Sequence, residues 1–362
     1  MRPAAGTALL GLVLILVAAT FDAEPLYVPG VAFVVLAGGA VAWVWVGARG
    51  VRVTRKVAAH RALEEEPVEI DLVVRAGALG LPAGAVEDDL LPEPAPLGVG
   101  RRTTRVRIEV RFRRRGRKAL SPPRVVVRDP FGLATRVVTA PDAAELLVLP
   151  RIHPVTTPDG SGDGTGVAAR RGRPSAAAEV DLDGLRPYRE GVQASRIFWP
   201  ALARSGELME RRLRADSDTR PLVVLDPRTP TSEDDLDAAV RAAASLTVHL
   251  AHHGGCALLL PGDRRPTVLD PSLHGWPTLH VRLALVSAAA APNLAGLGSR
   301  RGPVLYVAAR VPGRAPRVLA HAPGGGRVLI VPGRFGLRPV LFEVAGCLGF
   351  EVSASRSRVE AA

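Results

Sequence analysis

Cysteine is scarce in this chain of 362 residues, which contains only Cys256 and Cys347. Each of the two lies alone in an apolar segment, and no Cys-x-x-Cys pair is present, so the sequence excludes a disulfide framework. Two isolated apolar thiols are typical of a reduced protein core in the cytosol. Aromatic residues are also few, at 4% of the chain, which disfavours a surface that stacks on single-stranded nucleic acid.

Lysine is nearly absent as well. Lys56 and Lys118 are the only two, although Lys and Arg together number 47 and the formal net charge is +12. A charge of this sign usually indicates nucleic acid or anionic lipid as a partner. The chain is also rich in Ala, Gly, Pro, Val and Arg, a pattern of GC-rich genomes. Part of the arginine excess is therefore codon usage rather than selection for phosphate binding.

Two long runs lack charge altogether, at 3–21 and 25–48, and a basic cluster at 49–56 follows them. A helix rises 1.5 Å per residue, so each run is long enough to cross a hydrocarbon core of about 30 Å. Trp43 and Trp45 lie near the end of the second run, where aromatic side chains favour the membrane interface, and the basic cluster is typical of a cytoplasmic flank. We therefore predict a cell-membrane protein with two transmembrane helices and cytoplasmic C-terminal domains.

An alternative is that the first run is a signal peptide, with small residues at Ala18, Ala19 and Thr20 near a possible cleavage point. The second run would then act as a stop-transfer segment, and its basic flank would still keep the rest of the chain inside. The first run is long for a signal core, which favours the uncleaved hairpin.

The sequence predicts an α+β multi-domain fold in four parts. These are the transmembrane hairpin with its basic flank at 1–56, a β-rich sandwich-like module at 57–155, a linker and signature segment at 156–220, and an α/β domain at 221–362. The region after the hairpin is long enough for two domains, each with its own core.

Alternation of apolar and charged residues identifies the clearest strand of the β-rich module, at 104–113. No helical pattern separates the expected strands, which favours an antiparallel sandwich. The proline-rich segment 81–100 is expected to be a long surface loop, and the glycine-rich segment 156–178 a linker or mobile loop. The other expected strands are 68–74, 124–128, 134–139 and 145–149.

From residue 221 onward, apolar runs alternate with helical patterns. Uninterrupted apolar strands that alternate with helices are typical of a mostly parallel sheet covered on both faces. Acidic residues near 232 suit the amino end of a helix, and Gly254 and Gly255 end it. The expected strands are 222–225, 256–260, 304–308 and 328–331, and the expected helices are 232–253 and 276–290.

Between the two domains, the chain reads Leu-Arg-Pro-Tyr-Arg-Glu-Gly at 185–191, Arg-Ile-Phe-Trp at 196–199 and Leu-Ala-Arg-Ser-Gly-Glu-Leu at 202–208. Together with Arg-Asp-Pro-Phe-Gly-Leu at 128–133, these motifs resemble the bacterial family known as "domain of unknown function 58". The resemblance covers nearly the whole chain. It implies two membrane helices, a β-rich region, the signature segment and a von Willebrand factor A-like (Rossmann-type) domain.

The chain departs from this family at two places. Val192 stands where the family commonly has Asp, so any contact that relies on that carboxylate is absent. In metal-binding von Willebrand A domains an Asp-x-Ser-x-Ser run supplies oxygen ligands to Mg²⁺. The corresponding run here starts at Asp226 and has Arg228 and Pro230 in place of the serines. Neither side chain offers an oxygen ligand, so we predict a degenerate metal site, no bound metal and no cofactor.

The signature residues have two main interpretations. They form a stacked collar that joins the β module to the α/β domain, or they bind a partner peptide, because Arg, Tyr and Trp dominate interface energetics. A catalytic role is a third and weaker interpretation, and we predict no enzymatic activity. The candidate residues are Arg186, Tyr188, Gly191, Arg196, Trp199 and Arg204.

Other candidate motifs are weak. His249, His252 and His253 have helical spacing that can hold a transition metal, but histidines are also favoured in the last turn of a helix. Glycine clusters at 160–166 and 324–326 lack the ending of a phosphate-binding P-loop, and no Gly-x-Ser-x-Gly elbow occurs.

The resulting hypothesis is a membrane-tethered interaction protein. The family resemblance implies a MoxR-type AAA+ ATPase as its protein partner, in the assembly or maturation of envelope complexes. An alternative is a protein that binds anionic lipid or nucleic acid through arginines of the β module, although nucleic acid is disfavoured by the lack of stacking residues. These arginines are Arg105, Arg107, Arg111, Arg113, Arg114, Arg115 and Arg117. The third hypothesis, an enzyme of unknown type, requires an acid, base or nucleophile in a cleft.

Overall fold

The computed structural model describes residues 2–77, 80–141, 143–158, 182–188, 198–213, 220–295, 297, 302–321 and 326–352. The chain divides into two compact units, Met1–Val148 and Leu149–Ala362. Each unit has its own hydrophobic core, and the two are described separately.

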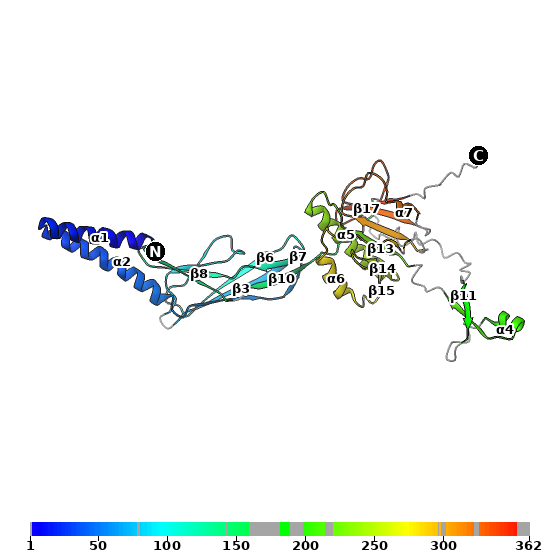
Figure 1. Ribbon diagram of the computed structural model, residues 1–362, viewed down its shortest axis with the longest axis horizontal. Coiled ribbons are helices and arrows are strands. Elements are labelled where there is room, and N and C mark those ends of the chain that lie inside the picture. Colours follow the sequence, from blue (N-terminus) through cyan, green and yellow to red (C-terminus); the bar gives the residue numbers. More distant parts are fainter. Residues whose placement is uncertain are drawn as a thin grey trace. The chain divides into compact units, whose positions relative to one another are not determined.

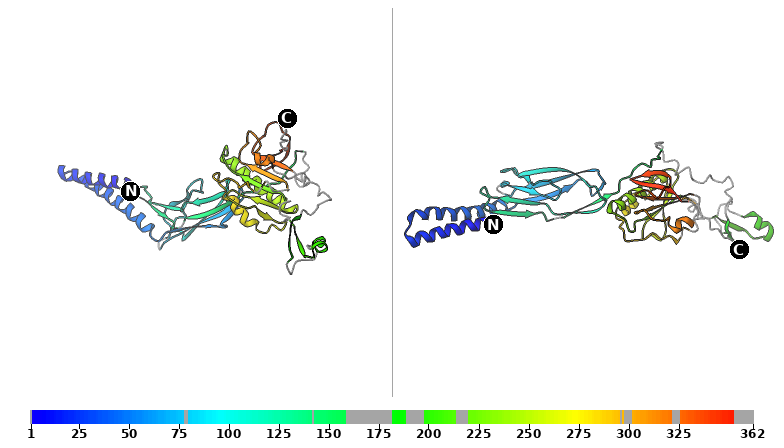
Figure 2. Two further views of the ribbon diagram at one scale, coloured as in Figure 1. Left: turned by 45° about the vertical axis from the view of Figure 1, so that its right-hand side comes forward. Right: turned by 90° about the horizontal axis from the view of Figure 1, so that it is seen from above.

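The first unit begins with a helical hairpin. Helices α1 (Arg2–Phe21) and α2 (Tyr27–Gly47) are joined by the short 3-10 helix η1 (Glu24–Leu26) and lie side by side in every view (Figure 1, Figure 2). Both helices are long and apolar enough to cross a membrane. They cross closely at two glycines, since a Cβ atom on Gly11 would lie 2.7 Å from the backbone oxygen of Gly30.

The hairpin is followed by a module of short antiparallel strands in three sheets. The sheets have the strand orders β1-β3-β6, β2-β10-β7 and β5-β4-β8-β9, and every ladder described between them is antiparallel. The first and third sheets share one core, and the second packs against β3 in a smaller one. The strands are β1 (Arg52–Val57), β2 (Arg61–Leu63), β3 (Pro67–Arg75), β4 (Gly84–Glu87), β5 (Ala95–Pro96), β6 (Thr103–Arg111), β7 (Gly116–Leu120), β8 (Arg124–Arg128), β9 (Thr135–Thr139) and β10 (Ala144–Leu149).

All five strands expected for this module are present. In β6 the predicted alternation is confirmed, because Val106, Ile108 and Val110 are turned inward and the arginines and Glu109 between them are exposed. The prediction that 81–100 is only a surface loop is wrong. This segment contains β4 and β5 and buries Leu81, Val86 and Leu97 in the core of the module.

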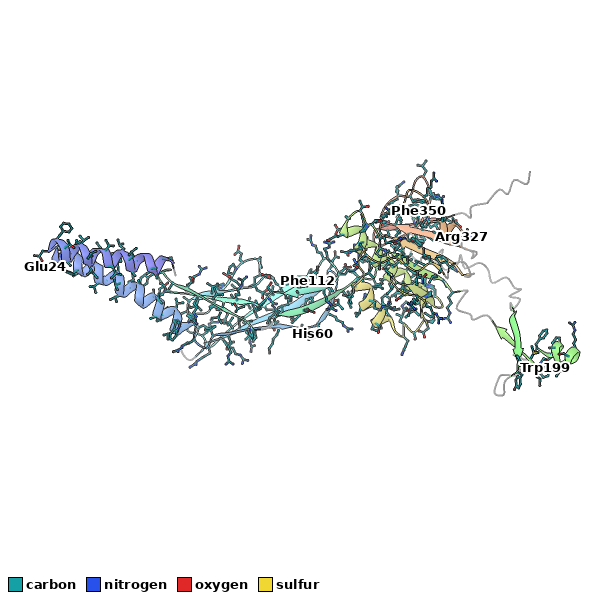
Figure 3. All side chains as sticks on the ribbon, in the orientation of Figure 1. Glu24, His60, Phe112, Trp199, Arg327 and Phe350 are labelled. Carbon is teal, nitrogen blue, oxygen red and sulfur yellow. The ribbon has the colours of Figure 1, made fainter. Side chains whose placement is uncertain are left out.

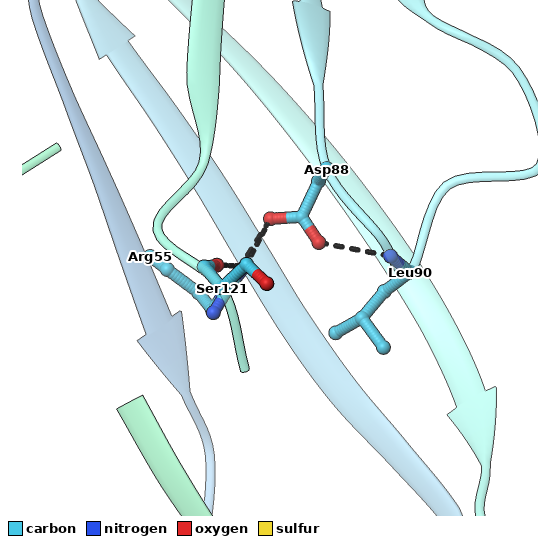
Figure 4. A network of polar contacts seen from close by, with 4 residues as sticks. All are labelled: Arg55, Asp88, Leu90 and Ser121. Atoms are coloured by element: carbon cyan, nitrogen blue, oxygen red, sulfur yellow. Dashed lines mark hydrogen bonds and ion pairs between the residues drawn. The ribbon is translucent and has the colours of Figure 1, made fainter. Parts of the chain in front are cut away.

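The second half of the basic cluster at 49–56 lies in strand β1. Arg55 is 3% exposed and forms an ion pair with Asp88, whose side chain is fully buried (Figure 4). Arg55 Nη2 donates to Asp88 Oδ2 at 2.5 Å and to the carbonyl oxygen of Ser121 at 2.6 Å, and the amide of Leu90 donates to Asp88 Oδ1 at 3.0 Å. This cation is therefore neutralised inside the module.

The helical hairpin and the β module form one packed body. Ala40, Val44 and Ala48, at the end of α2, are buried in the same cluster as Val125 and Val127 of β8. The last turns of α2 therefore pack against the core of the β module.

The second unit is built on a seven-stranded sheet with the order β15-β14-β13-β16-β17-β19-β18. The four strands from β14 to β17 in this order are parallel, and the three others are antiparallel to their neighbours. The expectation of a mostly parallel sheet therefore holds for its centre and not for its edges. The strands are β13 (Leu222–Asp226), β14 (Cys256–Leu259), β15 (Thr267–Leu269), β16 (Val304–Ala308), β17 (Arg327–Val331), β18 (Val340–Val344) and β19 (Cys347–Glu351).

Both faces of this sheet are covered, which explains the uninterrupted apolar runs. Alternate residues of each central strand enter two different cores. Helices α5 (Glu233–His252) and α6 (Trp276–Ala284) pack on one face, and Leu319 of α7 (Arg317–His321) packs on the other. Ser232 caps α5 by accepting from the amide of Asp235, and the acidic residues that follow lie in the first turn, as the sequence predicts. Helix α6 is shorter than the expected 276–290.

Residues 149–156 belong to this second unit. Val155 is buried in its larger core, the amide of His153 donates to Ser245 Oγ at 2.9 Å, and Thr156 bridges to Glu343 of β18. Nε2 of the buried His280 donates to the carbonyl oxygen of Pro150 at 2.7 Å. The segment is thus fixed at both ends.

The signature segment contains a small hairpin. Strands β11 (Leu182–Pro187) and β12 (Met209–Leu213) pair with each other in an antiparallel two-stranded sheet, and helix α4 (Trp199–Ser205) lies between them in the chain. Most of the expected linker at 156–178 lies outside the described residues.

Candidate functional site

The candidate site lies at the carboxyl edge of the parallel strands in the seven-stranded sheet. Strands β13, β16 and β17 all end at this edge. The next two central strands in the chain, β14 and β16, lie on opposite sides of β13, so the order of the strands reverses there. In open α/β sheets, such a divergence opens a crevice at the carboxyl ends, where ligands usually bind. Asp226 occupies this position, as the last residue of β13.

Asp226 is held by two side chains of this edge. Arg228 donates from Nε to Oδ1 at 2.8 Å and from Nη2 to Oδ2 at 2.9 Å, so the two groups form a bidentate ion pair. Tyr306, on β16, donates its hydroxyl to Oδ2 at 2.5 Å. The amide of Arg228 also donates to Oδ1 at 3.2 Å. Both carboxylate oxygens therefore have partners from the chain itself.

The protonation of this cluster follows from its burial and its hydrogen bonds. Burial of Asp226, which is 9% exposed, opposes its ionisation, but the hydrogen bonds from Arg228 and Tyr306 outweigh burial and lower its pKa. Burial first, and then the hydrogen bond to Asp226, raise the pKa of Tyr306. At neutral pH the cluster is an ionised carboxylate with a neutral tyrosine and a guanidinium. It has neither a free base nor a nucleophile.

A cation would have to displace Arg228 to reach Asp226. The guanidinium occupies both oxygens, and Arg228 offers no oxygen ligand in exchange. Among the residues that the structure describes, no group of three His, Cys, Asp or Glu side chains is placed to hold a metal ion. The edge is thus built to neutralise the carboxylate from within the chain.

Next to this cluster lies an open groove, which we call the β16–β17 groove. Its lining comes from the loops that follow β16 and β17, and its volume is about 600 Å³. The loops touch, since a Cβ atom on Gly333 would lie 3.1 Å from a methyl group of Val311. The groove is lined by Val311, Pro312, Gly313, Arg314, Ala315, Phe335, Gly336, Leu337 and Arg338.

The floor of the groove is apolar and its surroundings are positive. Phe335 is buried against Phe350, with ring centroids 6.1 Å apart, and the guanidinium of Arg338 lies 5.3 Å above the Phe335 ring. Leu337 is fully exposed. The two loops, 309–316 and 332–339, contain no acidic residue and carry four exposed arginines: Arg310, Arg314, Arg334 and Arg338.

The signature residues that the structure describes lie in or next to strand β11 and in helix α4, before the Asp226 cluster in the chain. Trp199 begins α4 and is 56% exposed, and Arg204 is exposed in its last turn. The amide of Tyr188 donates to the carbonyl oxygen of Leu208 at 2.9 Å, which extends the β11–β12 hairpin. The backbone of Arg186 lies opposite that of Glu210 in the register of that hairpin.

Gly191 and Arg196 lie outside the described residues. The collar and the peptide-binding interpretation of the signature segment therefore stay predictions.

The histidine cluster is part of a helix end. His253 Nδ1 lies 2.8 Å from the carbonyl oxygen of His249, and the two rings are 4.5 Å apart. His253 therefore binds a free carbonyl oxygen in the last turn of α5. A role of the histidines at the helix end was the alternative to metal binding in the sequence analysis. Cys256 and Cys347 are free and buried, and burial raises the pKa of each thiol to about 12. Both predicted core thiols are confirmed.

Sequence reasoning missed Tyr306 and the groove. Tyr306 lies in an apolar run that reads as an ordinary core strand, and nothing local links it to a residue 80 positions earlier. Segments 310–315 and 333–338 both contain two arginines and at least one glycine, and this similarity was the signal that could have pointed to the two loops. A scan of protein-family models and a search of curated proteins found no match to this chain.

Proposed function

We propose that this chain is a membrane-tethered interaction protein that binds a partner protein at the β16–β17 groove. This proposal rests on the combination of an apolar groove floor with two loops that carry four exposed arginines, two of which line the groove, and no acidic side chain. Aromatic and arginine side chains are the groups that contribute most to protein interfaces. The expected ligand is therefore a segment with apolar anchors and acidic flanks.

The α/β domain supports this function as a degenerate von Willebrand factor A-like domain. Its strand order β15-β14-β13-β16-β17 follows a doubly wound arrangement, and the Arg228 guanidinium fills the position where a bound cation would sit. A domain of this kind binds through its edge loops without a metal bridge. The polar groups at the edge are satisfied by one another, which supports a binding role rather than catalysis.

The family resemblance makes a MoxR-type AAA+ ATPase the first partner to test. The apolar helices α1 and α2 confine the protein to a membrane, with the β module and the second unit in the cytoplasm. In this arrangement the partner is recruited to the inner surface of the cell membrane, where envelope-associated complexes are assembled or matured.

The test is capture of the ATPase from the same organism by full-length protein in detergent, with and without ATP. Two variants of exposed groove residues, Leu337→Asp and Arg314→Glu, are expected to reduce capture at least tenfold when combined. Val268→Asp is the control, because Val268 is exposed on β15, an edge strand that is separated from β16 by two other strands of the same sheet. Equal capture by the wild type and the groove variant would disprove the groove as the binding site.

A second candidate function rests on a basic hollow of the β module. A depression of about 270 Å³ on the β1-β3-β6 sheet is lined by Lys56, Arg75, Arg105 and Arg107, with Asp71 among them. Arg107 lies 3.3 Å from Asp71, so one of these cations is partly neutralised. Such a surface suits an anionic ligand, such as lipid headgroups. Binding of anionic vesicles that does not weaken as salt rises would exclude this electrostatic function.

A further inference from the structure

We infer that the loop between β8 and β9 is a third membrane contact, which inserts Phe131 into the interface beside the first turn of α1. This inference rests on the proposal that α1 and α2 span a membrane. It adds a loop of the β module to the contacts that the helices make.

The loop is rigid and presents its aromatic residue outward. Asp129 is buried, and its carboxylate accepts from the amide of Phe131 at 2.8 Å and from the amide of Ala134 at 2.5 Å. Gly132 has a φ of +71°, a conformation that suits glycine. These restraints leave Pro130, Phe131 and Gly132 on the surface, and Phe131 is 68% exposed. The turn therefore holds a large apolar side chain on the surface of the module.

The helical hairpin fixes where this loop lies. The amide of Ala4, in the first turn of α1, donates to the carbonyl oxygen of Leu133 at 3.1 Å. This backbone contact joins the loop directly to the start of the helix. Leu133 also packs in the core that contains the last turns of α2.

The contacts between the two helices set the level of the loop relative to the membrane. Gly11 of α1 faces Gly30 and Val34 of α2. Ala4 lies about two helical turns before Gly11, and the antiparallel helix therefore brings about residues 37–41 to the same level. Trp43 and Trp45 follow immediately and are both exposed. The loop thus lies at the level of the two tryptophans.

The chemistry of this level suits the headgroup region of a bilayer. Tryptophan and other aromatic side chains prefer the boundary between hydrocarbon and water. Arg128 is exposed next to the loop, and Arg49 lies over the Trp45 ring at 4.0 Å, so cations are available for lipid phosphates. The one carboxylate of the loop, on Asp129, is turned inward. A lipid surface continuous with the helices is therefore the occupant that this tip fits.

The experiment uses full-length protein in lipid nanodiscs, with single cysteines introduced at three exposed positions and labelled with an environment-sensitive dye. Phe131→Cys tests the loop. Leu12→Cys, in the middle of α1, tests whether the helix spans the bilayer. His60→Cys is the control, because His60 lies at the end of the β module away from the helical hairpin (Figure 3). Lipids that carry a nitroxide near the headgroup or deep in the chain then report the depth of each dye.

At position 131 we expect blue-shifted emission that is quenched by the shallow nitroxide, and at position 60 water-like emission without quenching. Water-like emission at 131 would overturn the inference. A blue shift at 131 without quenching would also overturn it, because a protein rather than lipid would then cover the loop. If position 12 is not quenched by the deep nitroxide, the spanning helices themselves are disproved. Quenching at 12 with none at 131 rejects the loop contact alone.

Discussion

Arg228 donates hydrogen bonds to both carboxylate oxygens of Asp226, which lies two residues before it in the chain, at donor–acceptor distances of 2.8 and 2.9 Å. Asp226 therefore receives its counter-charge from within the chain. Tyr306, which donates to Oδ2, is the third member of this cluster.

Removal of the Arg228 side chain should destabilise the second unit. Arg228→Ala leaves Asp226 buried with fewer partners, and the loss of hydrogen bonds to a charged group costs about 1–3 kcal/mol. Arg334→Ala, at an exposed arginine of the same edge, is the matched control. Denaturant unfolding of both variants at neutral pH measures the difference.

The effect of Arg228→Ala should depend on pH. The folded-state pKa of Asp226 is lowered, so the stability that the pair contributes is present above the unfolded pKa of about 3.9 and is lost as pH falls through the folded pKa. The wild type and the variant should therefore approach equal stability in acid. A difference that stays constant from neutral pH to strongly acidic pH would contradict this assignment.

Magnesium should leave the thermal stability of the wild type unchanged. Any ion that binds the folded state raises the midpoint of unfolding by mass action, and Asp226 has no free oxygen to offer. Differential scanning fluorimetry with magnesium and with a chelator checks this. A midpoint that rises with magnesium concentration and is lost in Asp226→Asn would show that the cation displaces Arg228.

The buried ion pair of the β module should be needed for its stability. Asp88→Ala leaves the Arg55 guanidinium uncompensated inside the protein, which costs about 3–5 kcal/mol. The double variant Arg55→Leu, Asp88→Leu should lose less, because neither charge then stays buried alone. A double variant that is less stable than Asp88→Ala would show that the pair itself stabilises the module.

The close crossing of the two apolar helices α1 and α2 should not tolerate a methyl group at Gly11. In Gly11→Ala the new Cβ atom meets the backbone oxygen of Gly30 at 2.7 Å, and neither backbone can move aside without separating the helices. A destabilisation of about 1–3 kcal/mol is expected for such overpacking. Gly6→Ala is the control in the same helix, since a Cβ atom there has no neighbour within 4 Å. Thermal unfolding in detergent compares the two.

Both cysteines should be unreactive in the folded protein. Burial raises the pKa of Cys256 and Cys347 to about 12, so neither thiolate nor access is available at pH 8. A thiol reagent is expected to titrate two thiols after denaturation and none before it. Rapid reaction of the folded protein would contradict the buried assignment.

The sequence predicted those elements whose pattern is local. Strand β8 lies at the expected 124–128 and β16 at the expected 304–308, because an apolar run between turn residues needs no distant partner to be recognised. Strands β18 and β19 were missed. Their turn uses Ala345, which has a φ of +51°, and Gly346, so the Asn-Gly or Asp-Gly signal of a tight hairpin is absent.

The site was predictable only at its first residue. Asp226 ends an apolar run, which marks the carboxyl end of a strand, and the sequence shows Arg228 two residues after it. The bonding of Tyr306 depends on β16 lying beside β13, which is a property of the sheet order and not of either segment. The ion-pair partner of Arg55 was not predictable for a similar reason, since Asp88 lies 33 positions later in the chain.

Thr156 exchanges backbone hydrogen bonds with Glu343 at 2.9 and 2.7 Å, on the otherwise unpaired side of the outermost strand. An open strand of this kind is a template for joining other chains. A truncated α/β domain that begins at residue 221 would lose this short cover and should self-associate, whereas one that begins at residue 149 retains it. Recombinant preparations of the domain alone should therefore start before this segment.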